Sequence, residues 1–428
     1  MLFERIMERN PSLIEAAVRL HQDGMVPTSS WIYDLDAVAH NARVLAVEAR
    51  RLGLTTYVMT KQHARNPMVT QVALSQGLNK TVAVDIFCAK LLHRYGIPLG
   101  HAGHLNQIPK HEIGRVLDMN PDLVTVYSVE AARQIDHIAR EKGRTQDLLV
   151  RVWKPGDVFF PGQEGGFREE QVIDAARQIK QLGNVRIVGV TSFPVLSYNF
   201  TDSNAEVRFN PNMQTITGAA QRLREELDLN ISVINAPGNT SHATLAMLRE
   251  GGATHVEPGH GLLGTTPSQI VDSDHPELPT YVYVTEITHH HEGRGYAHAG
   301  GLWTLLGNFL DERWKIRALV GADPEAAKQN PVDYEHMNQI IDYHAAFIPG
   351  DRCRVGDTVV FPMYTQAHMT RAHIVPVSGI STGEPVVWGI FDHAATMVDE
   401  NFDPIPPAEV RTRLDELVAH YAPLPLTS

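Results

Sequence analysis

The chain has 428 residues, which is enough for two or three domains of ordinary size and a large buried core. Hydrophobic residues make up 43% of it and charged residues 20%, a balance typical of globular rather than disordered proteins. Its 37 basic and 49 acidic residues give a net charge of −12, so we expect neither nucleic acid nor an anionic membrane as its main partner.

The start of the chain and its cysteines bound the cellular setting. Residues 1–28 carry charges throughout and have apolar residues at helical spacing, which predicts a helical lead-in and not a signal peptide. No apolar run in the sequence is long enough to cross a bilayer. The two cysteines, Cys88 and Cys353, exclude a disulfide framework, so we expect a reducing, cytoplasmic location.

From residue 29 to residue 275, short β-branched runs alternate with amphipathic helical stretches. The strand-like runs lie at residues 55–61, 80–87, 103–108, 122–128, 147–153, 185–193, 230–237 and 253–259. A doubly wound open sheet would also alternate in this way. The count of eight strand–helix units is what favours an α/β fold of the (β/α)8 barrel type.

The rhythm changes in residues 276–428. Strand-like segments with glycine and proline between them dominate this part, and a helical spacing over residues 334–347 interrupts them. We therefore expect a mostly β C-terminal domain after the barrel.

Gly259, Gly261 and Gly264 form the pattern G-x-G-x-x-G. A dinucleotide turn should follow the first strand of a βαβ unit and open a helix, whereas this one follows the eighth strand and leads into a proline-rich segment. The loop after the seventh strand, which contains Gly238 to Ser241, also offers backbone amides just before a helix. Two such loops together predict a phosphorylated ligand, with ordinary glycine-rich barrel loops as the alternative.

Lys61 ends the first barrel strand, where barrel enzymes place their chemistry. A lysine that loses hydration there has a lowered pKa, and its free amine can attack an aldehyde. The alternative from position alone is a partner for a phosphate or a carboxylate.

The segment WIYDLDAVAHN at residues 31–41, the strand that ends at Lys61 and the loops NAPGNTS and VEPGHGLLG resemble the fold type III family of pyridoxal phosphate enzymes. That family includes alanine racemase, basic amino acid decarboxylases, D-threonine aldolase and D-serine dehydratase. The resemblance covers nearly the whole chain and is greatest to the alanine racemase-like YhfX-type subgroup. It implies pyridoxal 5'-phosphate as cofactor, held covalently by Lys61. It also implies that the cofactor's phosphate is bound by Gly238, Asn239, Thr240, Gly259 and His260, so that these glycines approach a phosphate, although not that of a dinucleotide.

Three further positions carry information about the reaction within this resemblance. Glu257 takes the place of the partner of the pyridine nitrogen, where the decarboxylases also have a glutamate and alanine racemase has an arginine. Phe193 stands where the family often has a histidine over the cofactor ring, so stacking is kept without the polar group. His63, two residues after Lys61, resembles the aldolase and dehydratase branch.

The second domain should supply another acid or base. The segment VGDTVVFPMYT resembles a decarboxylase motif and nominates Tyr364, which we expect to reach the barrel mouth of a partner subunit. Arg151 is assigned from its position to a substrate carboxylate. The His-x-Cys or His-x-Asp metal pair of the aldolase branch has no counterpart here. Strand alternation sends neighbours in the run at residues 289–291 to opposite faces, so we expect no metal.

These features predict a cytoplasmic homodimer with active sites at its interface and a small amino acid as substrate. Racemisation or epimerisation is the first hypothesis, and decarboxylation, aldol cleavage or another lyase reaction is the second. A non-catalytic pyridoxal phosphate-binding protein and a metal-dependent barrel hydrolase are further alternatives.

Overall fold

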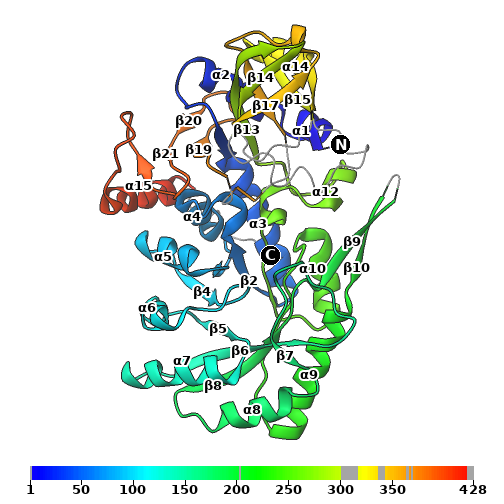
Figure 1. The fold of residues 1–428 in the computed structure, drawn as a ribbon, viewed down its shortest axis with the longest axis vertical. Helices are drawn as coiled ribbons and strands as arrows, with labels where there is room; N and C mark the ends of the chain where they lie inside the picture. The colour runs from blue at the N-terminus through cyan, green and yellow to red at the C-terminus, as the bar shows by residue number, and fades with distance from the viewer. Residues whose placement is uncertain are drawn as a thin grey trace.

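The computed structural model describes residues 2–201, 204–299, 317–335, 343–362, 366–367 and 370–421. Two large sheets dominate this described part, and they lie one above the other along the longest axis of the molecule (Figure 1). The lower sheet is a barrel with helices outside it, and the upper sheet contains most of the C-terminal residues.

The lower sheet confirms the predicted barrel. Within the described residues, its eight parallel strands are β2 (Thr55–Met59), β3 (Lys80–Ala83), β4 (Leu99–Ala102), β5 (Leu123–Val126), β6 (Gln146–Trp153), β8 (Val185–Thr191), β11 (Val233–Asn235) and β12 (His255–Val256). The ring closes because β12 pairs with β2 and β5 pairs with β6. Most residues of these strands are buried, as expected for parallel strands covered on both faces.

Helices surround the barrel on the outside. Those that follow barrel strands are α4 (Pro67–Ser75), α5 (Ile86–Arg94), α6 (Ile113–Asp118), α7 (Val129–Glu141), α8 (Val172–Lys180), α9 (Pro211–Leu227) and α10 (His242–Glu250). The eighth place is taken by α3 (Leu35–Arg51), which precedes β2 and contacts both α4 and α10. After β12 come only the short helices α11 (His260–Leu263) and α12 (Pro267–Val271).

The third barrel strand differs from the prediction. It is β4, whereas residues 103–108 form a loop. The chain turns at Gly103, whose φ of +75° is left-handed, and a Cβ at that residue would lie 2.8 Å from the Thr125 carbonyl oxygen. The strand is therefore formed by the four residues LGHA before Gly103, and not by the residues after it.

The upper sheet is mostly antiparallel. Its strands are β1 (Ser30–Asp34), β13 (Tyr281–His291), β14 (Arg294–His298), β15 (Arg317–Gly321), β16 (Pro331–Glu335), β17 (His344–Ile348), β18 (Thr358–Phe361), β19 (His373–Ser378), β20 (Val386–Val387), β21 (Ile390–Phe391) and β22 (Met397–Val398). In the described part, β13, β14, β17, β16, β15 and β18 pair in that order and close into a ring. The expected helix at residues 334–347 is wrong at both ends, which lie in β16 and β17.

Strand β1 links the two halves of the molecule. It lies within the segment that the sequence placed in the barrel, but it pairs with β13 and β19 of the upper sheet. The lead-in helices α1 (Leu2–Arg9) and α2 (Pro11–Gln22) pack against the same sheet, where Leu13, Ile14 and Val18 share an apolar cluster with Ile32. The upper domain thus contains residues from both ends of the chain.

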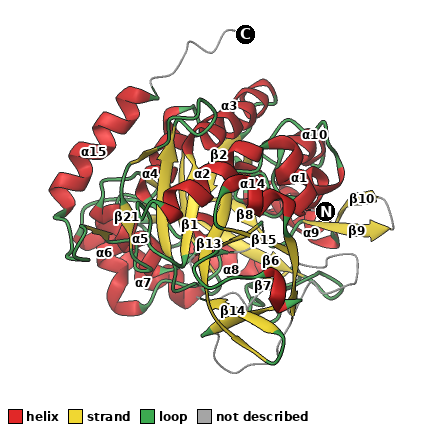
Figure 2. Cartoon of the chain, turned by 90° about the horizontal axis from the view of Figure 1, so that it is seen from above, coloured by secondary structure: helices red, strands yellow, loops and turns green. Residues whose placement is uncertain are grey.

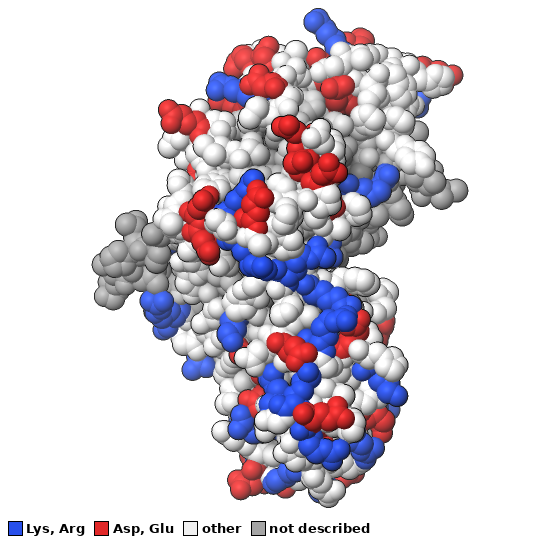
Figure 3. Space-filling model, turned by 90° about the vertical axis from the view of Figure 1, so that its left-hand side faces the viewer, with Lys and Arg blue, Asp and Glu red and all other residues white. Residues whose placement is uncertain are grey.

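The remaining elements lie at the edges. The hairpin of β9 (Leu196–Thr201) and β10 (Asn204–Phe209) extends away from the body, and α15 (Pro407–His420) lies on the opposite side (Figure 2). Strand β7 (Phe167–Arg168) pairs with β6, and α14 (Pro324–Gln329) lies against β15. None of the described helices has the length and apolar character needed to span a membrane. On the face in Figure 3, basic side chains gather at mid-height and acidic ones lie above and below them, so the net negative charge does not form a single acidic field there.

Asn41 holds the connection between the barrel and the upper sheet. Its side chain is fully buried, and its amide donates to the carbonyl oxygens of Leu262 at 2.9 Å and Leu278 at 2.7 Å. Its carbonyl oxygen accepts from the Leu278 amide at 2.7 Å. One side chain on α3 therefore satisfies three backbone groups of the segment that leaves the barrel.

We predict that Asn41→Ala lowers the free energy of unfolding by about 3 kcal/mol or more, because it leaves three buried backbone groups without partners. Urea unfolding at neutral pH measures this loss. The control is His40→Ala, which removes an exposed hydrogen bond to Pro276 of the same segment and should change stability by less than about 0.5 kcal/mol. Equal effects of the two substitutions would contradict the prediction.

Candidate active site

A cavity of about 190 Å³ opens at the carboxyl ends of the barrel strands. It lies where barrel enzymes carry their active sites. The residues that line it are Met59, Lys61, Gln62, Phe160, Gln163, Phe193, Pro194, Pro237, Gly238, Asn239, Thr240, Glu257, Gly259, His260 and Gln366.

Lys61 enters the cavity from a short 3-10 turn, Thr60–His63, directly after β2. Its side chain is buried, and its Nζ atom lies 5.9 Å from the centroid of the Phe193 ring. Burial lowers the pKa of Lys61, while the negative charge of Glu257 acts in the opposite direction. A buried amine with a lowered pKa is the form of lysine that can act as a nucleophile.

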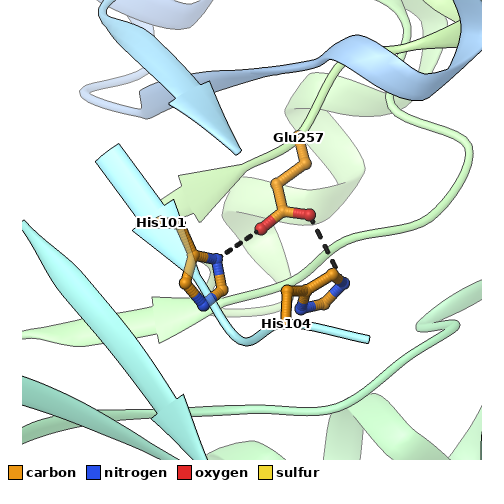
Figure 4. A group of neighbouring side chains, drawn as sticks. All are labelled: His101, His104 and Glu257. Carbon is orange, nitrogen blue, oxygen red and sulfur yellow. Dashed lines mark hydrogen bonds and ion pairs between the residues drawn. The ribbon is translucent and has the colours of Figure 1, made fainter. Parts of the chain in front are cut away.

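Glu257 follows β12 and points into the barrel, with His101 at one of its carboxylate oxygens and His104 at the other (Figure 4). His101 Nδ1 and Asn235 Nδ2 each lie 2.9 Å from its Oε1 atom. The other ring nitrogen of His101 is 2.6 Å from the Thr125 hydroxyl. The other carboxylate oxygen of Glu257, Oε2, lies 3.4 Å from His104 Nε2 and accepts no hydrogen bond from the described residues.

The charges of this group follow from its surroundings. Burial acts to raise the pKa of Glu257, but His104, His101 and Asn235 outweigh it and lower that pKa to about 2. Burial lowers the pKa of His104 to about 3, so His104 is neutral at pH 7. The hydrogen bonds from His101 and Asn235 are therefore what keep Glu257 ionised at neutral pH. Its open oxygen suits a cationic N–H donor.

The same residues could also hold a metal ion. His101, His104 and Glu257 each offer one ligand atom, these atoms lie within 4.8 Å of one another, and theirs is the single such group among the described residues. Two imidazoles and a carboxylate are a ligand set that zinc accepts. The sequence analysis, which expected no metal, did not recognise this group.

The loop after β11 has the features of an anion site. The backbone N–H groups of Gly238, Asn239 and Thr240 donate to no acceptor in the described part of the chain. The buried Thr240 hydroxyl is likewise without a partner there. Gly238 and Asn239 have φ values of +125° and +51°, which turn this stretch of backbone toward the cavity ahead of α10. Such a run of free donors before a helix suits a phosphate.

The three glycines of the G-x-G-x-x-G pattern have different functions. Gly259 lines the cavity, and a Cβ there would lie 2.7 Å from the Gln62 side-chain oxygen. A Cβ at Gly261 would lie 2.2 Å from the Thr240 carbonyl oxygen, and one at Gly264 would lie 1.8 Å from that of Leu278. Gly261 and Gly264 thus permit close packing of backbone segments, and the expectation that all three approach a phosphate is narrowed to Gly259.

Most of the predicted site residues meet at the cavity. Lys61 and Glu257 lie in its wall with the other predicted residues Phe193, Gly238, Asn239, Thr240, Gly259 and His260. Burial and the charge of Lys61 lower the pKa of His260 to about 3, and its Nδ1 atom is 2.9 Å from the Thr265 hydroxyl.

Two of the predicted residues that the structure describes do not line the cavity. His63 is fully buried, with Nε2 2.9 Å from the Thr70 hydroxyl, and burial lowers its pKa to about 3. Arg151 is also buried and donates to the Tyr127 hydroxyl and to the Gln163 carbonyl. Their roles toward cofactor and substrate stay predictions.

Tyr364 lies outside the described residues. Gln366, two residues further on, lines the cavity of its own chain.

Several residues of the site were missed from the sequence. His101 escaped notice because the third strand was placed four residues too late, at residues 103–108 and not at Leu99–Ala102. Asn235 was seen only as the start of a loop. Phe160 and Gln163, in the loop after β6, had no pattern that distinguishes them.

Comparisons with known proteins agree with this geometry. Residues 33–267 match the model of the alanine racemase N-terminal domain, and residues 282–387 match that of the YhfX-like C-terminal domain. The chain is 33% identical over 393 residues to the uncharacterized protein YhfX of Escherichia coli (strain K12), which covers 92% of this chain and 98% of that protein.

Solved structures share the fold at low sequence identity. D-threonine aldolase from Filomicrobium marinum has a TM-score of 0.61 at 14% identity, covering 86% of this chain and 96% of that one. Alanine racemase of Clostridium difficile 630 has a TM-score of 0.59 at 17% identity, covering 86% of this chain and 99% of that one. D-threo-3-hydroxyaspartate dehydratase from Delftia sp. HT23 has a TM-score of 0.58 at 15% identity, covering 85% of this chain and 97% of that one. The chain belongs to the family of the alanine racemase N-terminal domain, in the form that carries a YhfX-like C-terminal domain.

Proposed function

We propose that this protein binds pyridoxal 5'-phosphate through Lys61 and acts at the α-carbon of a small amino acid, with racemisation or epimerisation as the favoured reaction. The observation that carries the proposal is the placement of a buried lysine of lowered pKa in a cavity between a loop of free backbone donors and an ionised glutamate. The amine suits an aldehyde, the free backbone amides suit a phosphate, and the carboxylate suits a protonated ring nitrogen. These are the three groups that the cofactor presents.

The fit rests on polar groups that lack partners in the described chain. The amides of residues 238–240 and the Thr240 hydroxyl would hold the phosphate. Glu257 Oε2 would accept from the ring nitrogen, and its negative charge favours the protonated form of that nitrogen. Phe193, which lies beside Lys61, would pack against the ring.

Pyridoxal phosphate, when bound, supplies an electron-withdrawing ring that stabilises negative charge at the substrate α-carbon. Lys61 would hold the cofactor's aldehyde carbon and, once released, take the α-proton from one face. Tyr364 would return a proton to the other face in racemisation. The titratable residues among the described cavity residues are Lys61, Glu257 and His260. Because Glu257 is assigned to the ring, Tyr364 is our candidate for the second proton carrier.

A second candidate function is cleavage of another bond at the α-carbon, by decarboxylation or by a lyase reaction such as aldol cleavage. Glu257 supports it, because a carboxylate at the ring nitrogen keeps the electron-withdrawing power of the ring at its full strength. This candidate needs no second proton carrier opposite Lys61.

We propose a homodimer as the active unit. Phe160, which lines the cavity, is 50% exposed. A large exposed apolar side chain at the site supports its coverage by another chain. The small cavity supports a small amino acid as substrate. The proposal includes a cytoplasmic location, supported by the buried free thiols Cys88 and Cys353.

The first test is the absorbance spectrum of the purified protein between the near ultraviolet and the visible. With pyridoxal phosphate added, we expect a band that borohydride bleaches and that Lys61→Ala lacks. Because burial lowers the pKa of Lys61, the band should form at a pH where ordinary lysines are still protonated. A wild-type protein without such a band would remove the cofactor from the proposal.

The second test concerns the ring nitrogen. We predict that Glu257→Gln keeps the borohydride-sensitive band but slows deuterium exchange at the substrate α-carbon roughly 100-fold, because it removes the charge that stabilises the protonated ring. The matched control is Glu277→Gln, which changes another buried glutamate that lies outside the cavity wall. Equal slowing in both variants would argue against the assignment.

The third test distinguishes the reactions. We expect a panel of small amino acids in D₂O to include one that gains deuterium at the α-carbon and loses its optical purity without releasing carbon dioxide or an aldehyde. Release of either product would favour the second candidate instead. A bound cofactor without any exchange would favour the non-catalytic alternative.

A further inference from the structure

The hairpin of β9 and β10 lies outside the barrel but is connected to the donor-rich end of the cavity. It follows β8 and the cavity residues Phe193 and Pro194. Away from this base, β10 contacts α12, and the rest of the hairpin extends from the body (Figure 1). A hairpin of two strands is only marginally stable by itself, so the contacts that hold this one are informative. The proposed reaction gives it no part.

The base of the hairpin is bonded to the loop that carries the free amides of residues 238–240. The Val195 amide donates to the Pro237 carbonyl oxygen at 3.1 Å. The side-chain amide of Asn239 donates to the Leu196 carbonyl oxygen at 3.3 Å. The path of this loop is therefore tied to the start of β9.

Tyr198 makes a second connection. It lies on β9, and its phenol oxygen accepts a hydrogen bond from Ser268 Oγ at 3.2 Å. The hydroxyl of Ser241 is a further hydrogen-bond partner of the same phenol. Ser268 belongs to α12, whereas Ser241 is the N-cap of α10 and directly follows the free amides. One side chain of the hairpin thus joins the segment after β11 to the segment after β12.

The phenol of Tyr198 is neutral in these surroundings. Burial raises the pKa of Tyr198, although the hydrogen bonds from Ser268 and Ser241 act in the opposite direction. At pH 7 the side chain therefore brings no negative charge to the neighbouring loop. A neutral hydrogen-bonding group can order that loop without repelling an anion bound to it.

We propose that Tyr198 is a positioning residue for a phosphate group held by the amides of residues 238–240. It does not line the cavity, so it acts through Ser241, whose place fixes the direction of the amides before it. A loop that is already ordered loses less conformational freedom when its ligand binds. This inference rests on the proposed function, because it takes the phosphate of the cofactor as the ligand.

The test compares two ligands that differ in the phosphate group. Cofactor-free protein is titrated with pyridoxal 5'-phosphate and, separately, with pyridoxal, and the borohydride-sensitive band measures binding. We expect Tyr198→Phe to weaken the binding of pyridoxal 5'-phosphate about fivefold or more, because the loop loses hydrogen bonds that order it. The binding of pyridoxal should change by less than about twofold, because it has no phosphate for the loop to hold.

Two further variants serve as controls. Tyr95→Phe removes another phenol, which donates to the Ala395 carbonyl oxygen at 3.0 Å and lies outside the cavity wall. It should leave the affinity for both ligands unchanged. Ser268→Ala removes one partner of Tyr198 and should weaken the binding of pyridoxal 5'-phosphate alone, by a smaller factor than Tyr198→Phe.

The outcomes separate this inference from the proposed function. It is overturned if Tyr198→Phe leaves both affinities unchanged, or if it weakens both ligands equally, since a merely structural role would do the latter. Calorimetry with inorganic phosphate covers the case in which the wild-type protein forms no band. If Tyr198→Phe then weakens phosphate binding, the cofactor is removed and the positioning role stands. A wild-type protein that forms no band and binds no phosphate overturns both.

Discussion

An ionised carboxylate inside the barrel is the constraint on which the candidate site depends. A buried charge is costly unless hydrogen bonds compensate it, and Glu257 receives two, from His101 on β4 and Asn235 on β11. His101 is in turn fixed by Thr125 on β5. Side chains from β4, β5 and β11 thus hold one oxygen in place, and the second oxygen, 3.4 Å from His104 Nε2, accepts no hydrogen bond from the described residues. The barrel thus stabilises the ionised carboxylate of Glu257 and leaves its Oε2 atom able to accept a further hydrogen bond.

The other groups at the cavity follow from the same low-dielectric surroundings. Burial favours neutral forms, so Lys61 tends toward a free amine and His104 and His260 are uncharged at pH 7. Glu257 is the exception because it is hydrogen bonded. A ligand that brings both a cationic N–H and an anionic group would meet the carboxylate on one side and the amides of residues 238–240 on the other. Because one end of the cavity carries a negative charge and the other end is rich in hydrogen-bond donors, the cavity favours a ligand that has both a cationic and an anionic group.

The sequence predicted the barrel because parallel strands buried on both faces read as repeated apolar runs between amphipathic helices. It pointed to Lys61 because strand ends mark the barrel mouth, and to Glu257 through the family resemblance; the structure places both at the cavity. It failed where the direction of a side chain depends on where a strand begins and which strand it pairs with. Placing the third strand after Gly103 hid the inward direction of His101, and β1 resembles a barrel strand although its partners are far along the chain. For Arg151, the position was visible but the direction of its guanidinium was not, since that depends on Tyr127 and Gln163.

The run His289 to His291 shows the same limit from the other side. Simple alternation counted from the buried Ile287 would place His289 on the inner face of the strand. The bulge before His289 changes the count by one residue and reverses the assignment. Such a shift arises from pairing with β14 and leaves no trace in the composition of the strand itself. In both halves of the molecule, the face to which a histidine points therefore depends on where its strand begins and how it pairs, which becomes visible only when the partner strand is known.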